Sequence, residues 1–163
     1  MRIHFVAGMT LAVVVAACSS PRASSSAGQF TSCANSGAAH HAYVVVQHLN
    51  GASFQRCVGF DGSDIDGQSL MDQSGIQYGA HQLSSGKAVC QVDNEPQQYS
   101  QCFPQNQPYW ALFVEANGKW ASAPDGFTET KLHNADALGW RYVSASDSSP
   151  APPPLPRLTG ATT

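Results

Sequence analysis

The chain has 163 residues, a formal net charge of −3 and only 12% charged side chains. A chain of this length corresponds to one domain. The few lysines and arginines are scattered and form no basic patch to meet phosphates, which argues against nucleic acid as a partner. We therefore expect a single, small, monomeric domain.

The amino-terminal segment has the pattern of a bacterial lipoprotein signal. Residues 1–4 carry one arginine, and residues 5–17 form the one strongly hydrophobic stretch, which is short for a membrane span. This stretch closes with Val15-Ala16-Ala17-Cys18, in which small side chains precede a cysteine that can accept lipid. We expect a signal peptide over residues 1–17 and a membrane-anchoring diacylglycerol and palmitate on Cys18, at the extracytoplasmic face. An uncleaved anchor or an ordinary signal cleavage site is the alternative.

Two flanking segments have compositions typical of disorder. Residues 18–41 are rich in serine, alanine and glycine and have almost no aliphatic side chains, which predicts a flexible tether. Residues 144–163 contain Pro150-Ala151-Pro152-Pro153-Pro154-Leu155-Pro156, which predicts an extended and disordered polyproline II tail. The folded unit is therefore expected over residues 42–143.

Four cysteines follow Cys18, and an even number in an exported protein predicts two disulfides. Three pairings are possible. A Cys90–Cys102 disulfide is favoured because it would staple the polar, proline-containing segment between them to its flanking strand, which leaves Cys33 with Cys57. A zinc site is disfavoured because no two of these cysteines have the close spacing of zinc ligands.

The folded unit opens with a predicted β-hairpin. Residues 43–49 are largely apolar and β-branched, and Asn50-Gly51 is a favoured turn. Residues 53–58 then alternate with period two, as a strand does. Two paired strands are therefore expected at the start of the domain.

One short helix and further strands are predicted after the hairpin. Residues 64–74 predict the helix, with Asp64 as its cap and Gly75 as its stop. Five short segments, each bounded by glycine, proline, asparagine or aspartate, predict strands at residues 76–78, 88–92, 109–114, 119–122 and 140–143. Together with the hairpin they predict an α+β, mainly antiparallel β domain with one short helix.

Patterns for catalysis or metal binding are weak. No serine lies in a G-x-S-x-G motif, and no glycine-rich phosphate loop is present. Adjacent His40 and His41 would point in opposite directions on an extended chain, so they and His48 are not expected to share a metal ion. The aspartates of residues 61–66 do not match the register of a calcium loop and fit helix capping better. We expect a non-enzymatic protein without a cofactor or a metal.

Large aromatic side chains are the candidate binding residues. They can stack on planar ligands, although packing in the core is their more common role. Trp110 and Trp140 fall in predicted strands, whereas Trp120 follows the Asn117-Gly118 turn and is expected to be exposed. We take Trp120, Tyr109 and Trp110 as the candidate ligand-binding residues.

Three aromatic motifs close the predicted domain in a characteristic order: Tyr109-Trp110, the turn Asn117-Gly118-Lys119-Trp120, and Gly139-Trp140-Arg141-Tyr142. With the short helix that ends in Gly75 before them, residues 43–143 resemble the transcobalamin C-terminal-like family of β-grasp-related bacterial secreted domains. The resemblance implies a sheet curled over one helix and, in the named relatives, a domain that helps to cover a corrinoid.

This chain departs from those relatives because it shows no helical partner domain to complete a cobalamin site. A shared fold does not transfer a ligand. The resemblance therefore implies a freestanding module that binds a small molecule or a protein partner at the cell envelope. A structural or envelope-interaction lipoprotein without a small-molecule ligand is the alternative.

Overall fold

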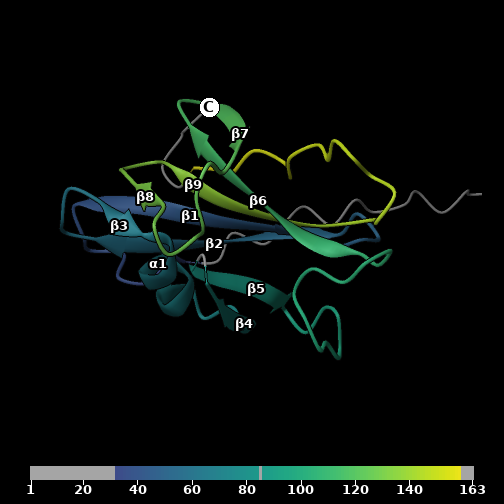
Figure 1. The fold of residues 1–163 in the computed structure, drawn as a ribbon. Coiled ribbons are helices and arrows are strands. Elements are labelled where there is room, and N and C mark those ends of the chain that lie inside the picture. The colour runs from purple at the N-terminus through teal and green to yellow at the C-terminus, as the bar shows by residue number, and fades with distance from the viewer. Residues whose placement is uncertain (1–31, 85, 159–163) are drawn as a thin grey trace, which may run out of the picture.

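A five-stranded sheet organises the computed structural model, which describes residues 32–84 and 86–158. Its strands, in spatial order, are β2 (Ser53–Phe60), β1 (His40–Gln47), β9 (Ala137–Val143), β6 (Tyr109–Ala116) and β7 (Lys119–Ser122) (Figure 1). β1 and β9 run parallel, and the other neighbouring pairs are antiparallel. The predicted signal peptide and Cys18 lie outside the described residues.

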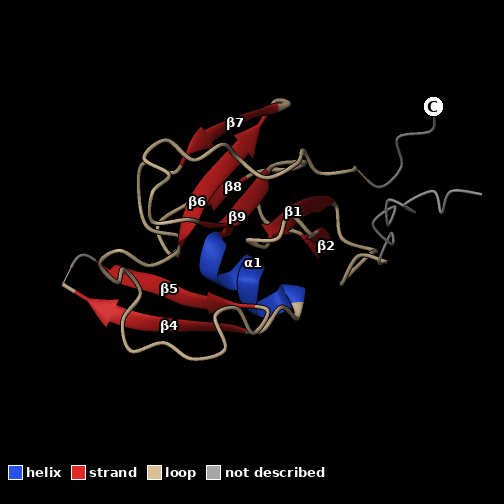
Figure 2. Ribbon diagram, turned by 90° about the vertical axis from the view of Figure 1, so that its right-hand side faces the viewer, coloured by secondary structure: helices blue, strands red, loops and turns tan. Residues whose placement is uncertain are grey.

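A helix and a second hairpin cover one face of this sheet. They are α1 (Gly67–Ser74) and the pair formed by β4 (Tyr78–Leu83) and β5 (Gly86–Val92). Figure 2 shows α1 between the large sheet and the β4–β5 hairpin. A two-stranded pair of β3 (Ile65–Asp66) and β8 (Lys131–Leu132) completes the layer. The chain thus folds as an α+β, mainly β domain, and its described residues contain no helix long and apolar enough to cross a membrane.

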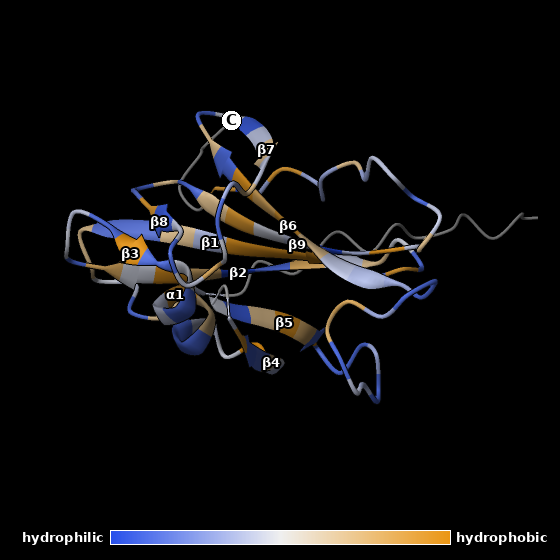
Figure 3. Cartoon of the chain, viewed as in Figure 1, coloured by the Kyte–Doolittle hydropathy of each residue, from blue (hydrophilic) through white to orange (hydrophobic). Residues whose placement is uncertain are grey.

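The central strands are apolar on both faces. In β1, Val44 and Val46 are fully buried beneath α1, while Tyr43 and Val45 point the other way and are also buried. The hydropathy colouring of Figure 3 is orange where β1 carries three consecutive valines, Val44, Val45 and Val46. Because alternate residues of a strand face opposite sides, both faces of the sheet need a cover.

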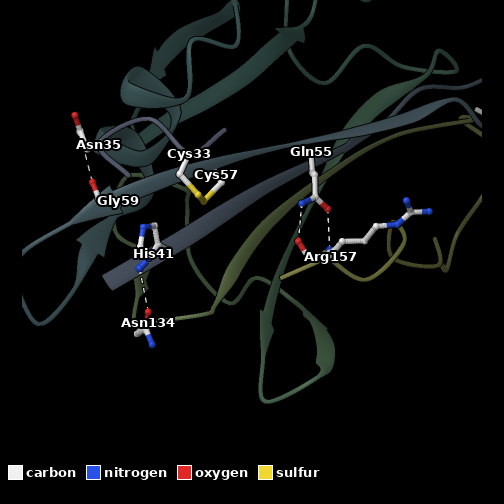
Figure 4. Close-up of a disulfide and its surroundings, with 8 residues drawn as sticks. All are labelled: Cys33, Asn35, His41, Gln55, Cys57, Gly59, Asn134 and Arg157. Carbon is white, nitrogen blue, oxygen red and sulfur yellow. Dashed lines mark hydrogen bonds between the residues drawn. A yellow bond between two sulfur atoms is a disulfide. The ribbon is translucent and has the colours of Figure 1, made fainter. Parts of the chain in front are cut away.

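Part of the predicted tether supplies that cover, so the folded unit begins before residue 42. Cys33 forms a disulfide with Cys57 of β2. The Ala34 N–H donates to the Cys57 carbonyl at 2.9 Å, and the Gly59 N–H donates to the Ala34 carbonyl at 2.7 Å. The Asn35 amide also reaches the Gly59 carbonyl (Figure 4). The described part of residues 18–41 is therefore attached to the sheet because β2 offers it both a disulfide and a backbone edge.

The expectation of a disordered tail is wrong for residues 144–158. Pro153 is buried, and Gln55 of β2 exchanges two hydrogen bonds of 2.8 Å with the backbone of Arg157 (Figure 4). The tail packs down because the apolar face opposite α1 would otherwise be open to water. Composition alone predicted disorder, because a proline-rich segment forms no hydrogen bonds within itself and its sequence does not show which surface it contacts.

The opening hairpin and the helix are confirmed, but the helix begins later than predicted. Asp66, rather than Asp64, is the cap: its carboxylate accepts from the Ser69 N–H at 2.8 Å. Gly75 ends the helix with a positive φ of 72°. The helix starts later because Ile65 and Asp66 form the strand β3, which pairs with β8 and so has an extended backbone.

The five predicted later strands are present, with β4 placed two residues further along and extended to Leu83. The β3–β8 pair was not predicted, because two-residue strands carry no periodic pattern. Both predicted disulfides are confirmed: Cys33–Cys57 and Cys90–Cys102 have Cα atoms 4.4 Å and 4.0 Å apart.

Replacing Asp66 by alanine should lower the free energy of unfolding by about 1 kcal/mol, because the first helical turn loses its acceptor. Asp64→Ala is the matched control, since Asp64 makes only exposed contacts: it accepts from the Ser63 hydroxyl at 3.0 Å and forms an ion pair of 3.6 Å with Lys131. Urea denaturation of both variants measures the difference. An equal loss from the two replacements would contradict the assignment of the cap.

The effect of Asp66 should depend on pH. Burial opposes its ionisation, but hydrogen bonds from Ser69 and the charge of Lys131 outweigh burial and lower the pKa of Asp66. A carboxyl with a lowered pKa stabilises the fold above its unfolded pKa and loses that contribution as pH falls through the folded pKa. The stability gap between wild type and Asp66→Ala should therefore stay constant above about pH 5 and narrow as the pH falls below about 4. If the difference in unfolding free energy did not change with pH, the charge of the Asp66 carboxylate would not contribute to stability.

Peptide mapping without reduction should recover one linked pair around Cys33 and Cys57 and another around Cys90 and Cys102. The physical reason is proximity, because disulfides need Cα atoms within about 7 Å. Mass spectrometry of a proteolytic digest, compared before and after reduction, identifies the linked peptides. Any peptide joining Cys57 to Cys90 would contradict the pairing.

Candidate ligand-binding cleft

A cleft of about 590 Å³ lies beside β5 and the first half of β6. β7 pairs only with Phe113–Ala116, so no strand covers the earlier part of that edge of β6. Ser122 at the end of β7 and residues 123–127 after it form another wall. The cleft therefore exists because β7 is shorter than β6, and its volume is in the range of small-molecule sites.

Exposed apolar side chains stand at the rim of this cleft. Phe103 is 58% exposed and Leu83 is 40% exposed, and both line it. Phe127 and Trp140, which also line the cleft, are buried and in contact with each other, with ring centroids 5.9 Å apart. An aromatic floor with exposed apolar groups at its rim is an arrangement that favours ligand binding.

Few polar groups interrupt the apolar walls. Lys87 lines the cleft, and its ammonium donates to the Gln68 side chain at 3.0 Å. Ser122 at the end of β7 and Asp125 after it also line the cleft. The Trp140 indole N–H is buried and has no acceptor among residues 32–84 and 86–158. A mostly apolar cavity with a small number of polar groups suits an apolar ligand with limited polarity.

Two of the three candidate binding residues, Tyr109 and Trp110, line this cleft. Trp110 is only 3% exposed; its ring lies 4.9 Å from that of Tyr142, and its N–H donates to the Glu95 carbonyl at 2.8 Å. Trp110 is thus a core residue that also forms part of the cleft wall, whereas Tyr109 is half-buried. The structure brings both to one place because they are neighbours on the uncovered part of β6.

Trp120 is neither exposed nor part of the cleft. Its ring lies over Gly139 of β9, where an added Cβ would come within 2.6 Å of the indole. Its N–H is buried without an acceptor in the described part of the chain. The expectation of an exposed Trp120 is wrong because the missing side chain of Gly139 leaves room for the ring on the sheet.

Phe103 was missed by the sequence analysis. It follows Cys102 in a polar segment without predicted secondary structure, where a lone phenylalanine is unusual. The Cys90–Cys102 disulfide ties this segment to β5 and so holds Phe103 near the cleft. An isolated aromatic beside a disulfide cysteine in a polar loop was the available signal.

A polar cluster of His48, Asp93 and Glu95 lies outside the cleft, just after β1. The Nδ1 of His48 is 2.6 Å from a Glu95 carboxylate oxygen, and its Nε2 is 3.2 Å from an Asp93 oxygen. Burial and then the charge of Glu95 raise the pKa of nearby Tyr142. Because the two carboxylates bind opposite nitrogens of one ring, a single metal ion cannot reach all three groups in this geometry. The cluster instead fastens the end of β1 to the loop that carries Phe103.

Other potential metal ligands are also engaged elsewhere. Within residues 32–84 and 86–158, the one group with metal-ligand spacing is His81, Cys90 and Cys102. Its two sulfurs form a disulfide and supply no thiolate. His40 is the first residue of β1, whereas His48 follows the last residue of that strand.

Comparison with known proteins adds little to this geometry. No family model and no curated protein sequence matches the chain. A solved structure from Ruminococcus gnavus ATCC 29149, of a protein described provisionally as metal-binding, aligns with a TM-score of 0.48 and 14% identity over 64% of this chain and 97% of that chain. Similarity of this extent does not establish a shared function.

Proposed function

We propose that this protein is an exported, lipid-anchored binding protein, without enzymatic activity, that takes its ligand in the cleft beside β6. The anchor at Cys18 and the extracytoplasmic location are proposed from the signal-like sequence of residues 1–18. The single observation that carries the binding function is the cleft itself, about 590 Å³ with the exposed Phe103 at its rim.

The topology supports a β-grasp-like domain. The first and last strands, β1 and β9, pair in parallel at the centre of the sheet, and α1 lies across one face. That arrangement is consistent with the proposed resemblance to the transcobalamin C-terminal-like family. It does not extend to a corrinoid, because ligand choice depends on the site and not on the fold.

The walls of the cleft favour a ligand with an apolar, flat part. Tyr109 and Phe103 offer ring surfaces, and the buried Trp110 forms part of the wall behind them. Lys87 and Asp125 contribute charged residues to the lining. Either a small molecule or the apolar side chain of a protein partner would meet these groups. The alternative, a structural lipoprotein without a small-molecule ligand, accounts less well for an open cleft with exposed apolar groups.

Phe103→Ser should weaken binding of the dye 1-anilinonaphthalene-8-sulfonate by about fivefold or more, because the rim loses an aromatic contact. A fluorescence titration of the full chain measures the affinity. Leu49→Ser is the matched control, since Leu49 is 50% exposed but lies in the β1–β2 turn and does not line the cleft. Equal affinities for the two variants, or no dye binding by the wild type, would contradict the proposal.

A Cys18→Ala variant should remain as an unlipidated precursor, because the thiol that accepts the lipid is absent. Detergent phase partitioning and the mass of the protein recovered from cells measure lipidation and processing. Wild-type protein provides the control. Normal cleavage and detergent-phase recovery of the variant would exclude the lipid anchor but would leave the cleft unaffected.

A further inference from the structure

The tail of the chain occupies an organised site on the outer face of the five-stranded sheet, the face opposite α1. Strand register places two rows of residues there, one containing Gly139 and Phe113 and the next containing Glu115 and Trp120. Residues 151–158 run over this face and bury Pro153 against it. The tail therefore lies against a surface that carries a glycine, two aromatic rings and a carboxylate.

Pro153 sits where a glycine leaves a hollow. A Cβ built on Gly139 would lie 2.9 Å from the Pro153 ring and 2.6 Å from the Trp120 ring, so both rings meet over this position. Packing of proline against an aromatic ring is how proteins recognise polyproline II segments. The Trp120–Gly139 hollow therefore has the form of a proline pocket.

Side chains of the sheet also bind the backbone of the tail. Arg141 donates to the Ala151 carbonyl at 2.6 Å. Gln55 donates to the Arg157 carbonyl and accepts from the Arg157 N–H, both at 2.8 Å. A polyproline II segment has no internal hydrogen bonds, so its backbone groups are free for such contacts. These hydrogen bonds involve only backbone atoms of the tail, so they do not depend on the identity of its side chains.

The tail leaves two groups of this site without a full complement of partners. The Trp120 N–H is buried and has no acceptor within the described residues. Glu115 is 3% exposed and accepts from the Gly118 N–H at 2.5 Å, but it forms no ion pair with any described residue. A buried donor without an acceptor is costly, as is a buried charge without a counter-charge.

An open cavity adjoins the unpaired carboxylate. It has a volume of about 350 Å³ and is lined by Glu115 and Asp136 together with Leu155 and Leu158 of the tail. Leu155 and Leu158 are 54% and 43% exposed, so the tail places apolar groups beside two acidic ones. A basic side chain at the position of Leu158 would complement this cavity better.

We propose that the outer face is a binding site for a proline-rich, polyproline II segment of a partner protein, with a basic residue at the position that Leu158 takes here. The chain's own tail is the occupant in the absence of that partner. As a tethered segment it competes at an effective concentration on the order of millimolar. The partner displaces it by pairing with Glu115 and by offering an acceptor to the Trp120 N–H.

The test uses the full chain and two fluorescein-labelled peptides, residues 150–158 and the same peptide with Leu158→Arg, followed by fluorescence anisotropy. Pro153→Asp in the protein should release the tail and strengthen peptide binding about tenfold or more over wild type. The arginine peptide should bind about threefold tighter than the native one. Glu115→Gln, which keeps the acceptor for Gly118, should abolish that preference.

Controls separate loss of the site from loss of the fold. Trp120→Ala added to Pro153→Asp should remove binding while near-ultraviolet circular dichroism stays native-like. If that variant unfolds, Arg141→Ala replaces it, because this change removes only the donor to the Ala151 carbonyl. Equal binding by wild type and Pro153→Asp, or an arginine preference that survives Glu115→Gln, would overturn the proposal. Self-association of wild-type chain that the peptide reverses would assign the site to the tail of a second copy instead of a partner protein.

Discussion

The structure depends on a central pair of strands that is apolar on both sides. Val44 and Leu138 must be covered on one face, and Tyr43 and Ala137 on the other. Burial of apolar area is the main favourable contribution to folding, so each face acquires a layer. α1 and the β4–β5 hairpin form one layer. The Cys33 segment and the proline-rich tail form the other, which is why segments of disorder-like composition are part of the folded domain.

Incomplete cover of the sheet leaves the two places where we propose that partners bind. On the α1 side, β5 does not pair with β6 and β7 stops opposite Phe113, which leaves the cleft with Phe103 at its rim. On the outer side, the tail fills the Trp120–Gly139 hollow, and no residue of the described ranges 32–84 and 86–158 forms an ion pair with Glu115. Binding surfaces arise where apolar or charged groups remain after the fold has buried what it can.

Fixed points hold the irregular parts in place around these sites. The Cys90–Cys102 disulfide restricts the loop that carries Phe103, and His48 holds the same loop through Asp93 and Glu95. These contacts reduce the freedom of a segment that has little regular secondary structure, so the rim of the cleft is preorganised. Preorganisation lowers the entropy lost on binding.

Local pattern determined most of the elements and favoured the disulfide pairing that the structure confirms. Alternating and β-branched residues specified the opening hairpin, and Gly75 specified the end of the helix, because these signals act over a few neighbouring residues. Only the tertiary structure decided that Asp66 caps the helix, that Trp120 lies over Gly139, and that Pro153 is buried. Each of these depends on a partner far away in sequence: the β8 strand, a glycine on β9 and an apolar sheet face. Composition and periodicity carry no information about which distant surface a segment will cover, and that choice placed both sites.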